Sequence, residues 1–182
     1  EEVETEAAPL LELPNLLPLF DATISPHLGG ADTVRAAQAL YLVLTSRLLP
    51  VSRCASAFIQ GQSSVGKSHL AGTTLKFLPS SGIIHAQSMS SKALFYRAQG
   101  ELVDLGGKVL YLGEAASSLE VDFTVAILRQ LLSEGYATHE TVIDGEWVAL
   151  KVVGPVSALI TTTRSAIDPE METRFLSDWL DD

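Results

Sequence analysis

Apolar positions along the chain switch between helical spacing and short unbroken runs, with turn residues between them. Apolar residues spaced by three or four predict helices over 31–49, 69–78 and 120–134. Short apolar runs predict buried strands over 55–60, 82–86, 108–114 and 156–163. Helices that alternate with buried strands are typical of an α/β domain with a mainly parallel sheet.

One part of the chain departs from this alternation. Residues 136–143 and 146–153 are strand-like and flank Asp144-Gly145, the strongest short hairpin signal. A β-hairpin inserted into the α/β pattern is therefore expected. Beyond the last buried strand, residues 170–180 again place apolar side chains at helical spacing and predict a final helix, and a short helical piece is expected over 92–97.

The first 30 residues have a different composition from the rest. An acidic opening over 1–6 is followed by a leucine- and proline-rich segment over 9–20, whose prolines prevent a long helix. We expect a linker or a strap lying on the domain; a docking segment for a partner or a neighbouring subunit is the alternative. The core domain is expected over 31–182. The chain begins with Glu1 rather than Met, which indicates a piece of a longer protein.

Charge and composition narrow the function classes. The chain of 182 residues carries 22 acidic and 12 basic residues, a net charge of −10. This balance argues against a broad nucleic-acid surface, although it permits a narrow contact at one loop or in a ring pore. No apolar run is long enough to span a bilayer. The single cysteine, Cys54, excludes an internal disulfide framework, and we expect a cytoplasmic protein.

The strongest chemical signal lies directly after the strand predicted over 55–60. Gly61-Gln62-Ser63-Ser64-Val65-Gly66-Lys67-Ser68 fits the phosphate-binding pattern G-x-x-x-x-G-K-[ST], and a helix follows it from His69. Backbone N–H groups and the helix N-terminus would surround phosphates. Lys67 would reach the β- and γ-phosphates, and the Ser68 hydroxyl would hold Mg²⁺. An ordinary glycine-rich turn with a surface lysine is the alternative.

A second candidate lies at the end of the strand predicted over 108–114. Its apolar run ends in Glu114, and a buried parallel strand would deliver this carboxylate to the carboxyl edge of the sheet. Glu114 is the candidate for polarising water or assisting the metal. A helix-capping role for Glu114 is the alternative. Elsewhere, His85 is expected to be a structural histidine, because no other ligand-type residue stands at metal spacing.

The order of these features resembles the AAA+ ATPases. A phosphate-binding loop, an acidic-ended strand, a helix, a β-hairpin, a hydroxyl-ended strand and an Arg-Phe pair follow one another over about 31–182. Within AAA+ proteins, the chain resembles the group with a hairpin before the first sensor, which includes minichromosome-maintenance-like and superfamily 3 helicases. It is also similar to primase- or helicase-associated ATPases of mobile elements. The resemblance implies a three-layer P-loop NTPase core, ATP and Mg²⁺ as ligands, and a homo-oligomeric ring.

The resemblance also implies roles for single residues. Gly61–Ser68 would be Walker A, with His69 beside it, and Glu114 would be the Walker B glutamate. Thr162 or Thr163 matches the first sensor. Arg174 matches the arginine finger, which would act on ATP held by the neighbouring subunit. An ion pair of Arg174 with Glu170 or Asp178 on the same predicted helix is the alternative.

Three features differ from that family pattern. Gly113 stands where the Walker B aspartate is expected, the hairpin turn Asp144-Gly145-Glu146 is acidic where helicases present a basic residue, and the chain ends at Asp182 without a helical lid.

Three functions remain open from the sequence. The first is an ATP-hydrolysing motor in DNA replication or mobile-element maintenance, which would contact DNA through its pore or through other domains. The second is a nucleotide-dependent assembly module with little hydrolysis. The third is a small-molecule kinase, which would need more basic residues than the four that follow Lys108.

Overall fold

The computed structural model describes residues 8–10, 12–63, 66–85, 95, 102–113, 122–163 and 173–180, without the side chains of 122–124 and 178–180. Its centre is a parallel sheet of five strands in the order β2-β4-β7-β1-β8. The strands are β1 (Ser56–Gly61), β2 (Ile83–His85), β4 (Lys108–Leu112), β7 (Val156–Thr162) and β8 (Phe175–Leu180). The parallel α/β class expected from the sequence is confirmed.

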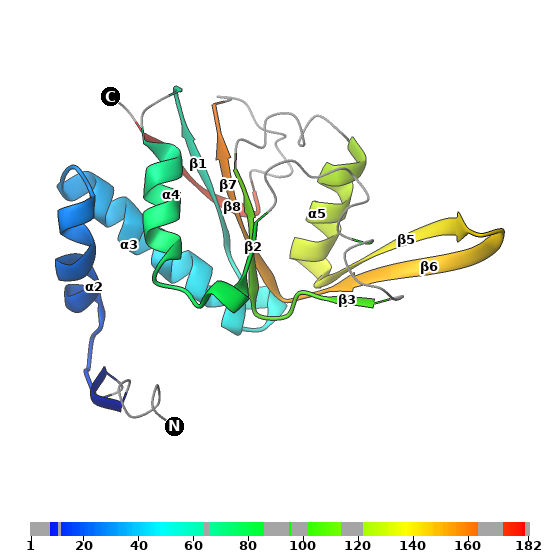
Figure 1. The fold of residues 1–182 in the computed structure, drawn as a ribbon, viewed down its shortest axis with the longest axis horizontal. Helices are drawn as coiled ribbons and strands as arrows, with labels where there is room; N and C mark the ends of the chain where they lie inside the picture. The colour runs from blue at the N-terminus through cyan, green and yellow to red at the C-terminus, as the bar shows by residue number, and fades with distance from the viewer. Residues whose placement is uncertain are drawn as a thin grey trace.

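Helices cover both faces of this sheet (Figure 1). One side carries α2 (Leu17–Ile24), α3 (Ala31–Thr45) and α4 (Lys67–Leu75), and the other carries α5 (Asp122–Glu134). Alternate residues of β1 explain the two layers, since Ala57 and Ile59 belong to the core cluster with α2 to α4, whereas Phe58 belongs to the cluster with α5. Short 3-10 turns occupy Ser25–His27, Ser46–Leu48, Val51–Arg53 and Ser80–Gly82.

A second, smaller sheet stands beside α5. It contains β3 (Leu102–Asp104), β5 (Tyr136–Ile143) and β6 (Glu146–Val153) in the order β3-β6-β5. The antiparallel pair β5–β6 is the hairpin expected from the sequence, with the same bounds, and it projects from the body of the domain (Figure 1). The inner face of the hairpin joins the core beside α5 through Ala137, Leu150 and Val152, and the partly buried Val148 packs against the same cluster.

Part of the leucine- and proline-rich segment is built into the core. Phe20, Ile24 and Leu28 are buried against α3 and α4. The Phe20 ring stacks on Tyr41 at 4.8 Å between centroids and meets Phe77 at 4.6 Å. Residues 17–28 therefore form a strap on the domain, while the domain boundary expected at residue 30 stays a prediction.

The helix expected over 170–180 is wrong. Residues Phe175–Leu180 form β8, which pairs in parallel with the whole of β1, from Ser56↔Phe175 to Gly61↔Leu180. The free edge of β1 offers these residues a row of backbone hydrogen bonds, and the Phe175 ring packs 4.1 Å from the Phe58 ring. Tertiary pairing thus overrides the helical spacing of the apolar residues.

The other elements follow the sequence prediction with small shifts. α3 ends at Thr45 and continues as a 3-10 turn before Pro50, and α4 begins two residues earlier than expected, at Lys67. The strand β3 was not predicted, because three residues are too few to show a period. The helical piece expected over 92–97 lies outside the described residues apart from Phe95, which is buried in the core cluster with α5.

Candidate functional site

The glycine-rich turn lies between the carboxyl end of β1 and the N-terminus of α4. Gly61 is the last residue of β1, and Lys67 is the first residue of α4. Gly66 precedes the helix with φ of 89°, a left-handed conformation that favours glycine. Gln62, Ser63, Ser68 and His69 are also placed, whereas Ser64 and Val65 lie outside the described residues. The strand, turn and helix that the phosphate-binding pattern requires are therefore present.

The Lys67 ammonium group is held inside this turn. Lys67 is 7% exposed, and its Nζ donates to the Gly61 carbonyl oxygen at 2.9 Å and to the Gln62 carbonyl oxygen. Gly66, the N-cap residue, has no side chain with which to cap the helix, and the first turn of α4 contains no acidic residue. The unpaired N–H groups and the helix dipole add positive potential beside the ammonium. Together they form a site suited to a phosphate group.

The residues expected to hold Mg²⁺ are only partly described. Ser68 lies exposed in the first turn of α4, where its hydroxyl can reach a metal bound to phosphate oxygens. One protein hydroxyl fits Mg²⁺, which keeps several waters and shares substrate phosphates. Glu114 lies outside the described residues, directly after Gly113 at the carboxyl end of β4. Within the described ranges, no group of three or more His, Cys, Asp or Glu side chains could hold a metal by itself.

The carboxyl end of β7 brings the expected sensor threonine to the same edge of the sheet. β7 lies between β1 and β4, and Thr162 stands opposite Gln60, one residue before the glycine-rich turn. Thr162 is buried, and Thr163 is exposed just beyond the strand. The parallel sheet therefore collects the turn, Gly113 and Thr163 at one edge.

Arg174 lies at the opposite edge. It directly precedes β8, whose first residue pairs with Ser56 at the start of β1. Six strand residues at about 3.3 Å each place it roughly 20 Å from the glycine-rich turn of its own chain. Its Nε donates to Ser133 Oγ of α5 at 2.6 Å. The helix on which an ion pair with Glu170 or Asp178 was the alternative is not formed over Phe175–Leu180, and Glu170 and the Asp178 side chain lie outside the described residues.

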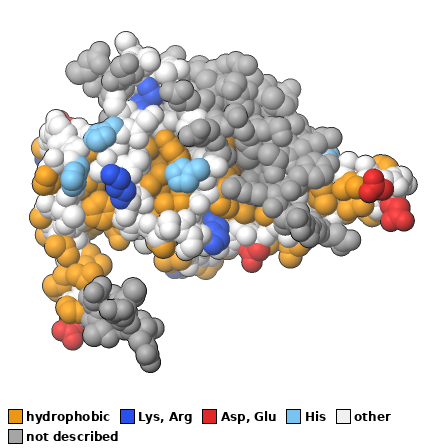
Figure 2. Space-filling view, viewed as in Figure 1, with side chains coloured by type: hydrophobic (Ala, Val, Ile, Leu, Met, Phe, Trp, Pro, Cys, Tyr) orange, Lys and Arg blue, Asp and Glu red, His pale blue; other side chains and the backbone are white. Residues whose placement is uncertain are grey.

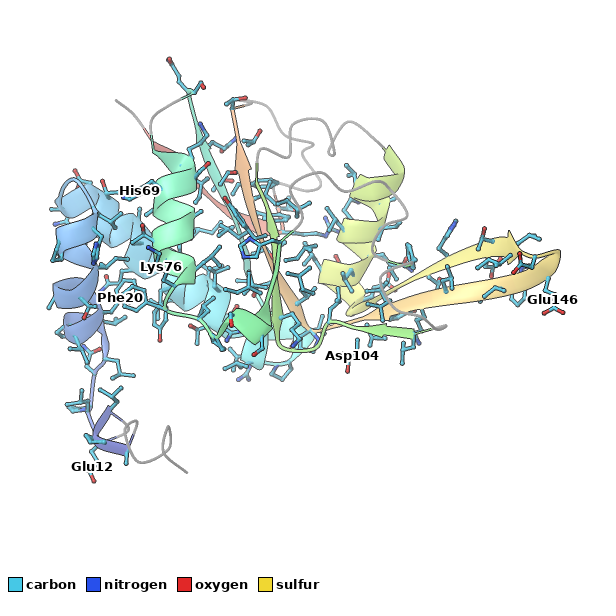
Figure 3. The ribbon with its side chains drawn as sticks, viewed as in Figure 1. Glu12, Phe20, His69, Lys76, Asp104 and Glu146 are labelled. Atoms are coloured by element: carbon cyan, nitrogen blue, oxygen red, sulfur yellow. The ribbon has the colours of Figure 1, made fainter. Side chains whose placement is uncertain are left out.

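His69 connects the glycine-rich turn to the strap. Its Nε2 donates to the carbonyl oxygen of His27 at 2.7 Å, so the first turn of α4 is tied to the loop between α2 and α3. Figure 3 shows His69 at the upper end of α4, with Lys76 near the other end, where it directly follows the helix. The sequence could propose His69 only as a neighbour of Lys67 and Ser68; its contact with a residue 42 positions earlier depends on the fold.

A groove beside α4 was not expected from the sequence. It runs from Ser68 along α4 and is bounded by the edge strand β2 and by Tyr111 of β4. His85, expected to be a structural histidine, is exposed here, with its ring edge-on to the Tyr111 ring at 5.6 Å. No sequence spacing could bring Ser68, His85 and Tyr111 together, because each belongs to a different element.

A parallel α/β sheet with a glycine-rich turn and a lysine at its carboxyl edge defines a P-loop domain. The family described as the MTBMA_p00010 P-loop domain matches residues 4–182, and the chain belongs to this family. No curated protein matches the chain.

Among solved structures, the fold is similar to NtrX from Brucella abortus, crystallised in complex with ADP, with a TM-score of 0.50 and 15% identity. The match covers 84% of this chain and 36% of the NtrX chain. Identity this low shows a shared fold alone. In the described part of the chain, no helix combines the length and apolarity needed to cross a membrane.

Proposed function

We propose that the chain is an ATP-binding and ATP-hydrolysing motor domain of the AAA+ type. The observation that carries the proposal is the buried Lys67 ammonium, held at the N-terminus of α4. A cation beside free N–H groups recognises the β- and γ-phosphates of a nucleotide. The ADP bound to the similarly folded NtrX is consistent with this ligand.

The carboxyl edge of the sheet supplies the remaining groups. Ser68 would hold Mg²⁺, which neutralises charge on the phosphates when it is bound. Glu114, directly after Gly113, would orient the attacking water and accept its proton. Thr163 would donate a hydrogen bond from its hydroxyl to the γ-phosphate or to that water, since β7 ends beside β1.

Arg174 would complete the site of a neighbouring copy. It lies roughly 20 Å from the glycine-rich turn of its own chain, so it cannot reach phosphates held there. A half-buried guanidinium at the edge of the sheet can instead meet a nucleotide across a subunit interface. This geometry supports a homo-oligomeric ring with shared sites.

Substitution of Lys67 tests nucleotide binding. Lys67→Ala should weaken binding of ATP about 10- to 100-fold, because one charge-assisted contact to phosphate is lost. Lys151→Ala removes the same charge from the distant strand β6 and should leave the affinity unchanged. Isothermal titration with ATP and Mg²⁺ measures both. Equal affinities for Lys67→Ala and the unmodified chain would contradict the proposal.

Hydrolysis and its biological role need a separate assay. Phosphate release per chain should rise with protein concentration if Arg174 acts across an interface, and single- or double-stranded DNA should stimulate it if the chain works in DNA replication or mobile-element maintenance. DNA would be contacted through the pore or through other domains, because the hairpin turn Asp144-Gly145-Glu146 is acidic.

A nucleotide-dependent assembly module is the second candidate. It is favoured by Gly113, which offers no carboxylate at the carboxyl end of β4 where a metal-associated aspartate would stand. Nucleotide-dependent oligomers without phosphate release, even at high protein concentration, would select this function over the motor.

A further inference from the structure

The turn of the β5–β6 hairpin carries an exposed apolar pair within an acidic setting. Val142 and Trp147 face each other across the two strands and are 65% and 66% exposed. The turn between them contributes the carboxylates of Asp144 and Glu146; Glu146 pairs with Ile143 and so lies on the other face of the hairpin from Trp147. Figure 3 places Glu146 at the far end of the hairpin, away from the body of the domain. An exposed Trp–Val pair at the end of a projecting hairpin marks a binding surface.

The groove beside α4 is concave where the turn projects, and it carries positive rather than negative charge. Its volume is about 370 Å³, and its lining includes Gly72, Leu75, Lys76, Ile83, His85 and Tyr111. The floor is apolar, and Lys76 is an exposed cation at its side. Lys108 adds a second positive charge nearby, where its Nζ donates to the Ser81 carbonyl oxygen at 2.8 Å. Lysine and histidine side chains gather over this face, whereas acidic side chains mark the hairpin turn (Figure 2).

We propose that the hairpin turn of one copy docks into the α4–β2 groove of a second copy. The Trp147 indole would enter the apolar floor, and the carboxylates of Asp144 and Glu146 would meet Lys76 and Lys108. A groove of about 370 Å³ lies within the usual size of a ligand pocket, about 300–1,000 Å³, and accepts an aromatic side chain. Opposite charges on the two surfaces direct the association.

The two surfaces cannot meet within one chain. The hairpin is anchored on α5 and β3 and points away from α4 (Figure 1). The contact is therefore head-to-tail, which generates a ring or a filament. The groove also includes Ser68, the expected Mg²⁺ ligand, but Lys76 follows it by eight residues, so the docked turn would lie about 12 Å along α4 from the phosphate site. This inference goes beyond the proposed function, because the contact forms without nucleotide.

Sedimentation of the full chain without nucleotide tests the contact. Trp147→Ala should weaken self-association at least about tenfold, because a central aromatic anchor is lost. Gly72→Leu should weaken it similarly by placing a side chain in the groove, since Gly72 lines the groove and a Cβ atom there meets nothing within 4 Å. Thr138→Ala changes the same exposed face nearer the domain and serves as the matched control.

Charge reversal tests the contact without removing the Trp147 side chain or filling the groove. Glu146→Lys and Lys76→Glu should each weaken association, and an equal mixture of the two variants should restore it, because every contact between the two different variants pairs opposite charges. A wild-type chain that stays monomeric, association that survives both Trp147→Ala and Gly72→Leu, or a mixture that associates no better than its components would overturn the proposal. ATP titration of the same variants reports nucleotide binding independently.

Discussion

Two glycines show that adding a Cβ atom can lower the stability of the fold at one position and raise it at another. Gly135 ends α5 with φ of 79°, and a Cβ atom there would lie 2.5 Å from Val51 Cγ2. Gly72 lies inside α4, where a Cβ atom meets nothing within 4 Å. The first position requires glycine for both conformation and space. At the second position, glycine makes the helix less stable than alanine would.

Gly135→Ala should therefore destabilise the chain by about 2–4 kcal/mol, because alanine adds left-handed strain and a clash with a stiff β-branched side chain. Gly72→Ala, the matched substitution, should stabilise it by about 0.5–1 kcal/mol. Urea unfolding followed by circular dichroism measures both. Equal effects of the two substitutions would contradict this account.

At the scale of single elements, two segments adopt conformations that depend on the elements packed against them. Residues 170–180 have apolar side chains at helical spacing, yet Phe175–Leu180 form a strand because β1 presents a free edge. Residues 17–24, rich in leucine with Pro18 at the start, form a short helix because Phe20 and Ile24 find a pocket on α3 and α4. In both cases the conformation depends on the element against which the segment packs, and the sequence of the segment does not show which element that is.

The strap should contribute to stability through Phe20. Phe20→Ala removes an aromatic ring that contacts Tyr41 and Phe77 and should cost about 3–5 kcal/mol. Leu19→Ala on the same helix removes a side chain that is 45% exposed and should cost far less. Thermal unfolding compares the two variants. A Phe20→Ala variant as stable as Leu19→Ala would show that α2 is not part of the cooperative core.

At the scale of the whole molecule, the sheet separates the groups of the proposed ATPase. The glycine-rich turn and Thr163 lie at one edge, and Arg174 lies at the other, beside Ser133 of α5. If Arg174 completes the site, as proposed, it must come from a second copy, and activity would depend on how copies meet.

This arrangement predicts complementation between two inactive variants. Lys67→Ala retains Arg174 but loses the phosphate-binding lysine, whereas Arg174→Ala has the reverse defect. In an equal mixture that assembles at random, about one interface in four joins an intact Lys67 to an intact Arg174. Phosphate release should recover to about a quarter of the unmodified level. A mixture as inactive as its two components would contradict the shared site.

Much of the candidate site was visible in the sequence because it is local. The glycine-rich turn needs only a strand before it, a helix after it and fixed residues between them, and all of these are contiguous over residues 55–78. The hairpin was equally accessible, since Asp144-Gly145 specifies its turn and alternation specifies its strands. Both predictions rest on interactions among neighbours in the chain.

Only the tertiary structure decided which strands and helices are neighbours in space. The order β2-β4-β7-β1-β8 brings Thr163 to the glycine-rich turn and Arg174 to the far edge, converts the last expected helix into a strand, and opens a groove between α4 and β2. These outcomes depend on pairing between segments more than 100 residues apart, such as β1 with β7. The sequence by itself determined the phosphate-binding turn and the hairpin, because local geometry and residue type specify them; long-range pairing determined the rest.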